Sequence, residues 1–183
     1  MEQDLKSKEI SGGLIILMIS LLGMLYFWYI NVNIFPLNWL LPTSTSLWEG
    51  GRLLFVSILI YGIVQYYIFG HDYKNFFFAK TASLFLAPMI FIGGSYLMDL
   101  LVGSVFMITH FLMFVIAVSI GQWISYTFLK TGYYFRFMNG YAILGIVVMM
   151  MVFFAHLNKT KTYQGPIFKP MSSYQKDILN NFD

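Results

Sequence analysis

Residues 44–69 read STSLWEGGRLLFVSILIYGIVQYYIF, and this stretch decides the fold class. Its polar start is followed by an apolar segment from about Arg52 to Phe69. An apolar segment of this length is close to the ~20 residues that a helix needs to cross a bilayer. Ser46 and Glu49 have the S-x-x-E spacing of a helix-capping box, so the sequence predicts a membrane helix that begins close to this point.

The composition of the whole chain agrees with a membrane location. Of its 183 residues, 58% are hydrophobic and only 10% are charged. A soluble domain carries about 25% charged residues, and a disordered chain needs low hydrophobicity, so both classes are excluded. The absence of cysteine excludes disulfides, cysteine nucleophiles and thiolate metal sites. The eleven Lys and Arg residues form no basic stripe, which excludes nucleic acid as a partner.

We predict an all-α, polytopic transmembrane helical bundle of five helices. The four further apolar segments cover about residues 14–34, 76–98, 105–129 and 137–157. The bundle forms a single domain over residues 1–157, and a polar tail follows over residues 158–183. Residues 35–51 contain Pro36 and Pro42, which interrupt helix, so this segment is expected to lie on the surface or to be partly re-entrant. A sixth span within this segment is the alternative.

The distribution of positive charge predicts the orientation. With five spans, the N-terminus and the loops after the second and fourth helices share one side of the membrane. That side carries Lys6, Lys8, Lys74, Lys80, Lys130 and Arg136, whereas the opposite loops carry Arg52 alone. The positive-inside rule therefore favours a cytoplasmic N-terminus in a multi-pass protein of the cell membrane. Four lysines in the C-terminal tail are the observation against this orientation.

Two interpretations of Glu49 are open. In the first, Glu49 belongs to the capping box and pairs with Arg52, three residues later on the same helix face. In the second, Glu49 is a ligand-binding or proton-handling group at a membrane mouth, beside Trp48. Ionisable residues at membrane depth are candidates for function, and this argument weakens at the interface.

The stretch Pro42 to Phe55 resembles the motif of an uncharacterised family of small bacterial polytopic membrane proteins. That motif is a proline, a polar run, Trp-Glu and a basic residue that enters an apolar helix. Trp48 and Glu49 match it, while Gly50-Gly51 stands where the family has His-Leu. Residues 117–126 resemble a second motif of this family, in which Gly-Gln is followed by Ser-Tyr. Residues 165–168 resemble a third.

This resemblance covers most of residues 35–170. It implies the fold of a small polytopic membrane protein, and it implies no activity. At His110 the family prefers an acidic residue, so no shared chemistry is implied at that position.

Further polar residues lie within the apolar segments. Asp99 and His110 are eleven residues apart, so they would share a face if one helix contained both, but a connection is predicted at about residues 99–104. Gln122 and Tyr126 are four apart on the predicted fourth helix, and Gln65 lies on the second. Such groups point inward, either as bonds between helices or as the lining of a polar cavity.

These residues leave three classes of function. The leading hypothesis is a small-molecule binding or transport-related membrane component, with a small-molecule or lipid ligand and with a homo-oligomer or a partner membrane protein. The second is a membrane-embedded enzyme that acts on a lipid-linked substrate, with Glu49 or His110 as acid or base. The third is a structural or accessory subunit.

The candidate residues for a cavity are Trp48, Glu49, Arg52, Gln65, Asp99, His110, Gln122 and Tyr126. No cofactor and no metal site is predicted, because no ligand spacing such as H-E-x-x-H is present.

Overall fold

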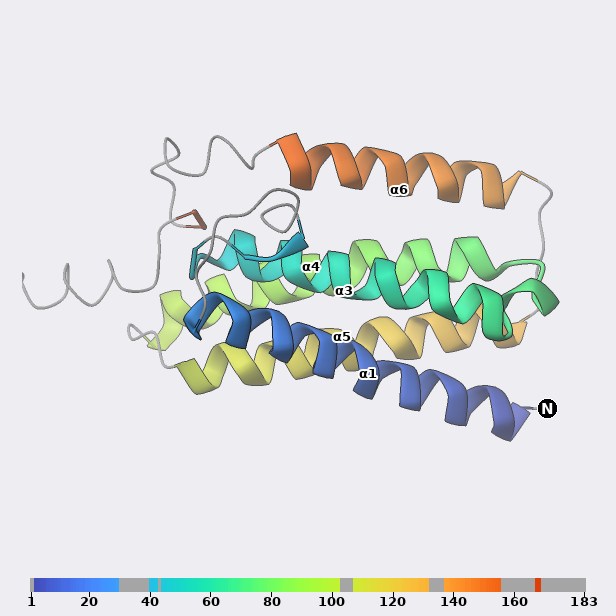
Figure 1. The fold of residues 1–183 in the computed structure, drawn as a ribbon, viewed down its shortest axis with the longest axis horizontal. Helices are drawn as coiled ribbons and strands as arrows, with labels where there is room; N and C mark the ends of the chain where they lie inside the picture. Colours follow the sequence, from blue (N-terminus) through green and yellow to red (C-terminus); the bar gives the residue numbers. More distant parts are fainter. Residues whose placement is uncertain are drawn as a thin grey trace, which may run out of the picture.

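The computed structural model describes residues 2–29, 40–42, 44–102, 107–131, 137–155 and 167–168. Within these residues the protein is all-α, as predicted, and contains no strand. The helices are α1 (Glu2–Tyr29), α3 (Leu47–Ile68), α4 (Phe76–Val102), α5 (Met107–Thr131) and α6 (Met138–Ala155), with a short 3₁₀ turn η1 (Gly70–Asp72) between α3 and α4 (Figure 1).

Five helices in the described residues are long and apolar enough to cross a membrane. The chain is therefore a multi-pass integral membrane protein, and the prediction of five helices is confirmed over the described residues. Residues 35–39 and 43 of the predicted loop, and with them the alternative of a sixth span, lie outside them. The end of that loop is helical, because α3 begins at Leu47.

Two helix boundaries differ from the prediction. Helix α1 begins at Glu2 and includes the polar residues that precede the apolar segment. Its first turns are stabilised by an ion pair between Lys8 and Asp4, 2.7 Å apart at positions i and i+4. Helix α4 extends to Val102, so Asp99 lies on a helix and not in a connection. The exposed apolar side chains of Leu100 and Leu101 continue its lipid-facing surface through that point.

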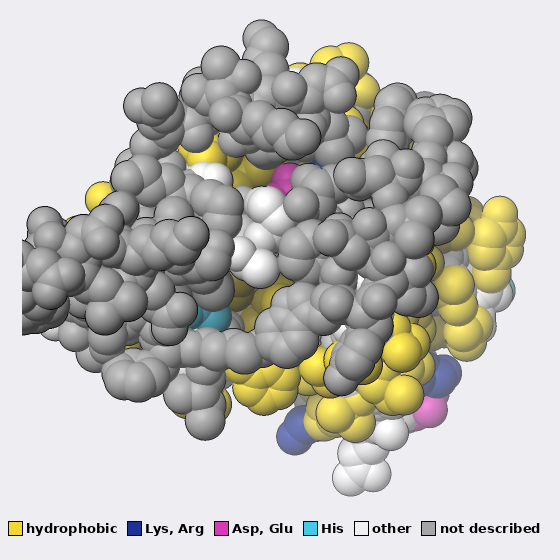
Figure 2. Space-filling view, turned by 60° about the vertical axis from the view of Figure 1, so that its left-hand side comes forward, with side chains coloured by type: hydrophobic (Ala, Val, Ile, Leu, Met, Phe, Trp, Pro, Cys, Tyr) yellow, Lys and Arg dark blue, Asp and Glu magenta, His cyan; other side chains and the backbone are white. Residues whose placement is uncertain are grey.

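The helices run side by side, and α3 occupies the centre of the bundle (Figure 1). About two thirds of its membrane-spanning residues are buried, compared with 11% for α6. Helices α1 and α4 both pack on α3, α5 packs on α1 and α4, and α6 packs mainly on α4. Large apolar side chains cover the outside, including Leu22 and Met151, and Figure 2 shows such side chains gathered on one described flank. These faces suit a lipid environment.

Glycines set the close approach of α3 to its neighbours. A Cβ atom at Gly50 would lie 2.6 Å from the ring of Phe91, and one at Gly51 would lie 2.5 Å from Ile92, both on α4. Larger residues at these two positions would push α4 away, which gives a physical reason for Gly-Gly after Trp48-Glu49. On the other side of α3, Gly12 and Gly23 of α1 allow an equally close approach.

Candidate ligand-binding site

A line of polar side chains follows one face of α3. Ser57, Tyr61 and Gln65 follow one another at intervals of four residues, so they project from the same side of the helix. This side faces α1, because Ser20 Oγ donates a hydrogen bond to Ser57 Oγ at 2.8 Å. Gly12 of α1 lies beside Tyr61 and Gln65, so these three polar groups lie along the interface between α1 and the second half of α3.

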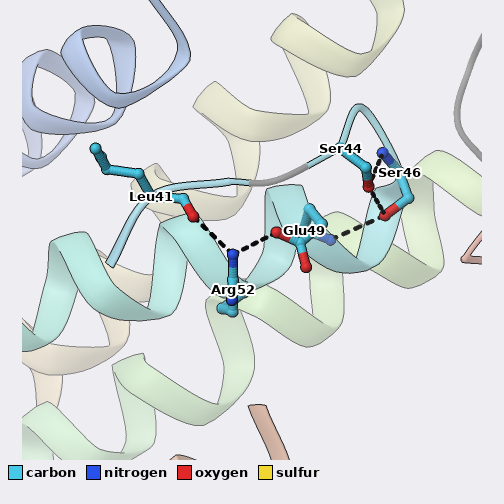
Figure 3. A network of polar contacts seen from close by, with 5 residues as sticks. All are labelled: Leu41, Ser44, Ser46, Glu49 and Arg52. Carbon is cyan, nitrogen blue, oxygen red and sulfur yellow. Dashed lines mark hydrogen bonds and ion pairs between the residues drawn. The ribbon is translucent and has the colours of Figure 1, made fainter. Parts of the chain in front are cut away.

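A separate group of polar side chains lies at the start of α3 (Figure 3). Ser46 Oγ accepts a hydrogen bond from the Glu49 N–H at 3.3 Å, which confirms the predicted N-cap. Glu49 forms an ion pair with Arg52, as the spacing predicted, and both side chains are at most 1% exposed. Arg52 Nη2 also donates to the carbonyl of Leu41 at 2.7 Å. The pair thus joins the segment before α3 to the first turns of the helix.

Trp48, beside Glu49 at the start of α3, packs against α6 and against the described residues of the tail. Its ring lies 5.0 Å from that of Phe153 on α6 and 5.2 Å from that of Phe168 in the tail. The backbone N–H of Trp48 donates to the backbone carbonyl of Ile167 at 3.2 Å. Trp48 therefore meets Ile167 and Phe168, the two described residues of the segment 165–168. These contacts hold Ile167 and Phe168 against the start of α3.

Asp99 and His110 meet across two helices. Asp99 Oδ1 of α4 lies 3.4 Å from His110 Nε2 of α5, and the histidine is 5% exposed. From their spacing, Asp99 and His110 would share a face if one helix contained both. In the structure they lie on two neighbouring helices, α4 and α5, and their side chains meet between them. This pair lies near the same end of the bundle as the start of α3, because α4 ends there and α5 begins there (Figure 1).

A second buried ion pair, absent from the sequence candidates, lies at the other end. Lys80 Nζ of α4 donates to both carboxylate oxygens of Glu9 on α1, at 2.7 and 2.8 Å. The two residues are 4% and 2% exposed. Lys80, counted above among the loop charges that predict the orientation, is therefore a buried residue of α4. The signal was available in the sequence, since Lys80 lies inside the apolar run FFFAKTASLFL and needs a partner there.

Two buried glutamines lie one layer deeper than this ion pair. A Cβ atom at Gly12 of α1 would lie 2.7 Å from Gln65 Nε2 and 3.6 Å from Gln122 Oε1, so both amides approach the same point. Gln65 is 1% exposed and Gln122 is 5% exposed. Among the described residues, Gln65 Nε2 has no hydrogen-bond partner, and neither do Nε2 and Oε1 of Gln122.

Gln122 borders a groove of about 480 Å³ between α1 and α5. Helix α1 lines this groove from Lys6 to Leu17, and α5 lines it from Val118 to Tyr126. Because α1 and α5 run in opposite directions here, Lys6 and Tyr126 share one end of the groove. Leu17 lies eleven residues after Lys6, so the α1 lining extends over about 16 Å of helix.

The predicted site residues thus fall into three places. Trp48, Glu49 and Arg52 lie at the start of α3, and Asp99 and His110 pair between α4 and α5. Gln122 and Tyr126 line the groove, and Gln65 lies behind it. In the part of the chain that the structure describes, no three His, Asp or Glu side chains cluster closely enough to hold a metal ion.

Comparisons of the chain with models of protein families, with curated proteins and with solved structures found no match. The resemblance of residues 42–55 to an uncharacterised family therefore stays a prediction. What the groove can do follows from its own residues.

Proposed function

We propose that this protein binds an amphipathic small molecule within the membrane, as a binding or transport-related membrane component. The observation that carries the proposal is the buried amide of Gln122 at the wall of the groove, with no partner for either polar atom among the described residues. A buried polar group without a hydrogen bond costs free energy, and native proteins contain few of them. A ligand that bonds to this amide would explain why it is there.

The distribution of polarity along the groove supports an amphipathic ligand. One end carries Lys6, Glu9 and Tyr126, and the other carries Leu14 and Leu17. Ligand sites are typically apolar concavities with a few polar groups that fix the orientation of the ligand. A molecule with one polar end and an apolar chain matches this order along the helix axis.

The same groove supports binding better than acid–base catalysis. A general acid or base must reach the reacting atom directly or through one water molecule. The carboxylate that lines the groove is Glu9, and both of its oxygens accept hydrogen bonds from Lys80. That engagement favours Glu9 as a structural group over a proton-transfer group.

The proposal is tested by filling the groove. Ser119 lines it and is exposed, and it donates a hydrogen bond to the carbonyl of Val115 in its own helix. Ser119→Phe should therefore preserve the fold and weaken the binding of a fluorescent acyl amphiphile at least tenfold. Thr127→Phe is the matched control, because Thr127 is an exposed α5 residue with the same type of bond, to Trp123, and lies outside the groove lining.

Binding is measured in lipid nanodiscs by titration of the fluorescent amphiphile. The proposal predicts tight, saturable binding to the original protein and to the Thr127→Phe variant. Equal affinities for Ser119→Phe and Thr127→Phe would show that the groove is not the binding site.

A further inference from the structure

The charges at the polar end of the groove restrict the class of ligand further. Lys6 lines this end and is exposed, and it has no ion pair with any described residue. The neighbouring charges are compensated: Lys8 pairs with Asp4 at 2.7 Å, and Glu9 pairs with Lys80. The positive charge of Lys6 is therefore left to act on a molecule in the groove.

The depth of the amide gives a second constraint. Gln122 lies beside Gly13, since a Cβ atom at Gly13 would be 3.4 Å from Gln122 Cγ. Gly13 is seven residues after Lys6, which places the amide about 10 Å deeper along α1. A ligand that satisfies both groups needs an anionic head and, further along the molecule, a polar group that precedes its apolar chains.

The polar atoms of Gln122 are buried beside two glycines of α1. Gln122 lines the groove through its side chain, and its amide lies next to Gly12 and Gly13 of α1. For Nε2 to bond to a molecule in the groove, the Gln122 side chain must rotate toward it. Val118 and Leu17 then border the deeper part, where an acyl chain would lie.

We propose that the ligand is an anionic glycerophospholipid, with its phosphate at Lys6 and an ester carbonyl accepting a hydrogen bond from Gln122 Nε2. This inference rests on the proposed binding function of the groove. A phosphate and ester carbonyls, in this order from the interface inward, are the polar groups that such a lipid offers. A Lys near a membrane surface strengthens the binding of an anionic lipid about fivefold.

Trp123 provides the readout, because it lines the groove and is quenched by brominated acyl chains that approach it. The experiment uses the full chain with Trp28, Trp39 and Trp48 replaced by Phe, so that Trp123 is the only tryptophan. The protein is placed in bilayers of a zwitterionic phospholipid. A small mole fraction of either brominated anionic or brominated zwitterionic phospholipid is then added.

The anionic lipid is expected to quench Trp123 at about one fifth of the mole fraction that the zwitterionic lipid requires. Lys6→Gln should abolish this preference, whereas Lys8→Gln should retain it, because Lys8 belongs to the same turns and lies outside the groove lining. Equal quenching by both lipids in the unaltered sequence would overturn the assignment of an anionic lipid, and so would an unchanged preference in Lys6→Gln.

The Ser119→Phe variant separates this inference from the function on which it rests. If both lipids quench equally, but more than a random distribution predicts, and Ser119→Phe removes the excess, the groove binds lipid without selecting its charge. Only the inference then fails. If neither lipid exceeds a random distribution and Ser119→Phe has no effect, the proposed function fails with it.

Discussion

Two kinds of buried polar side chain lie close together in the bundle, and they differ in whether their polar atoms are satisfied. Lys80 of α4 donates to both oxygens of Glu9 on α1, at 2.7 and 2.8 Å. One layer deeper, neither polar atom of the Gln122 amide has a partner among the described residues. Both groups lie at the interface between α1 and the rest of the bundle.

This difference shows that burial alone does not identify a site. A satisfied pair such as Glu9–Lys80 stabilises the packing of two helices and is explained by that role. An unsatisfied amide lowers stability, so its presence needs another reason. Polar residues in a membrane bundle can therefore be sorted by their hydrogen bonds into structural groups and candidates for ligand binding.

The largest expected effect comes from breaking the satisfied pair. Lys80→Met leaves the Glu9 carboxylate buried without its cation, which should lower the free energy of unfolding by about 3 to 5 kcal/mol. Equilibrium unfolding in mixed detergent micelles measures this change. Lys74→Met is the control, because Lys74 is exposed in a turn, and it should change stability by less than about 0.5 kcal/mol. Similar values for the two variants would contradict a structural role of the ion pair.

Substitution of the unsatisfied amide should have the opposite sign. Gln122→Leu keeps a similar volume and removes two polar atoms without partners among the described residues. In lipid-free micelles it should raise the free energy of unfolding by about 1 to 3 kcal/mol. The same unfolding assay measures it. A loss of stability of similar size would show that Gln122 acts as a bond between helices, as Glu9–Lys80 does.

A smaller effect on the free energy of unfolding is expected from a substitution that crowds the Gln65 amide. Gly12→Ala places a Cβ atom 2.7 Å from Gln65 Nε2 and 2.8 Å from Tyr61 Cε1, so these side chains must move. We expect a loss of about 1 kcal/mol, at the low end of overpacking, because the amide end of Gln65 can shift. Gly62→Ala is the matched control, since its Cβ atom meets nothing within 4 Å. It should be neutral or stabilising.

The smallest effect is expected at the neutral hydrogen bond between Ser20 and Ser57. Its length is 2.8 Å, and such bonds between membrane helices contribute about 0.6 kcal/mol. Ser57→Ala, Ser20→Ala and the double variant form a cycle in which the coupling energy should have this size. A coupling energy as large as that of Glu9–Lys80 would remove the distinction between charged and neutral pairs.

The sequence predicted features that depend on local spacing. The five helices follow from the lengths of the apolar segments, and the Ser46 cap and the Glu49–Arg52 pair follow from separations of three residues. Gln122 and Tyr126 were placed on one helix face by their separation of four, and both line the groove.

Features that depend on tertiary packing were not predicted. Glu9 and Lys80 are 71 residues apart, and their contact requires α1 to pack beside α4. The groove exists because α1 and α5 leave space between them along Lys6 to Leu17, which no local pattern encodes. Helix α4 extends beyond the predicted connection, because Asp99 is paired with His110 of the facing helix, which no local pattern shows.

The most direct test of the ligand account is the stabilisation of the protein by an anionic phospholipid. A ligand that binds the folded state raises the free energy of unfolding by an amount that grows with the logarithm of its concentration relative to its Kd. Unfolding is measured for the original sequence and for Gln122→Leu, each with and without the lipid in mixed micelles. The account predicts that the lipid stabilises the original sequence and stabilises Gln122→Leu much less. Equal stabilisation of both proteins would contradict the claim that the unsatisfied amide is part of a ligand site.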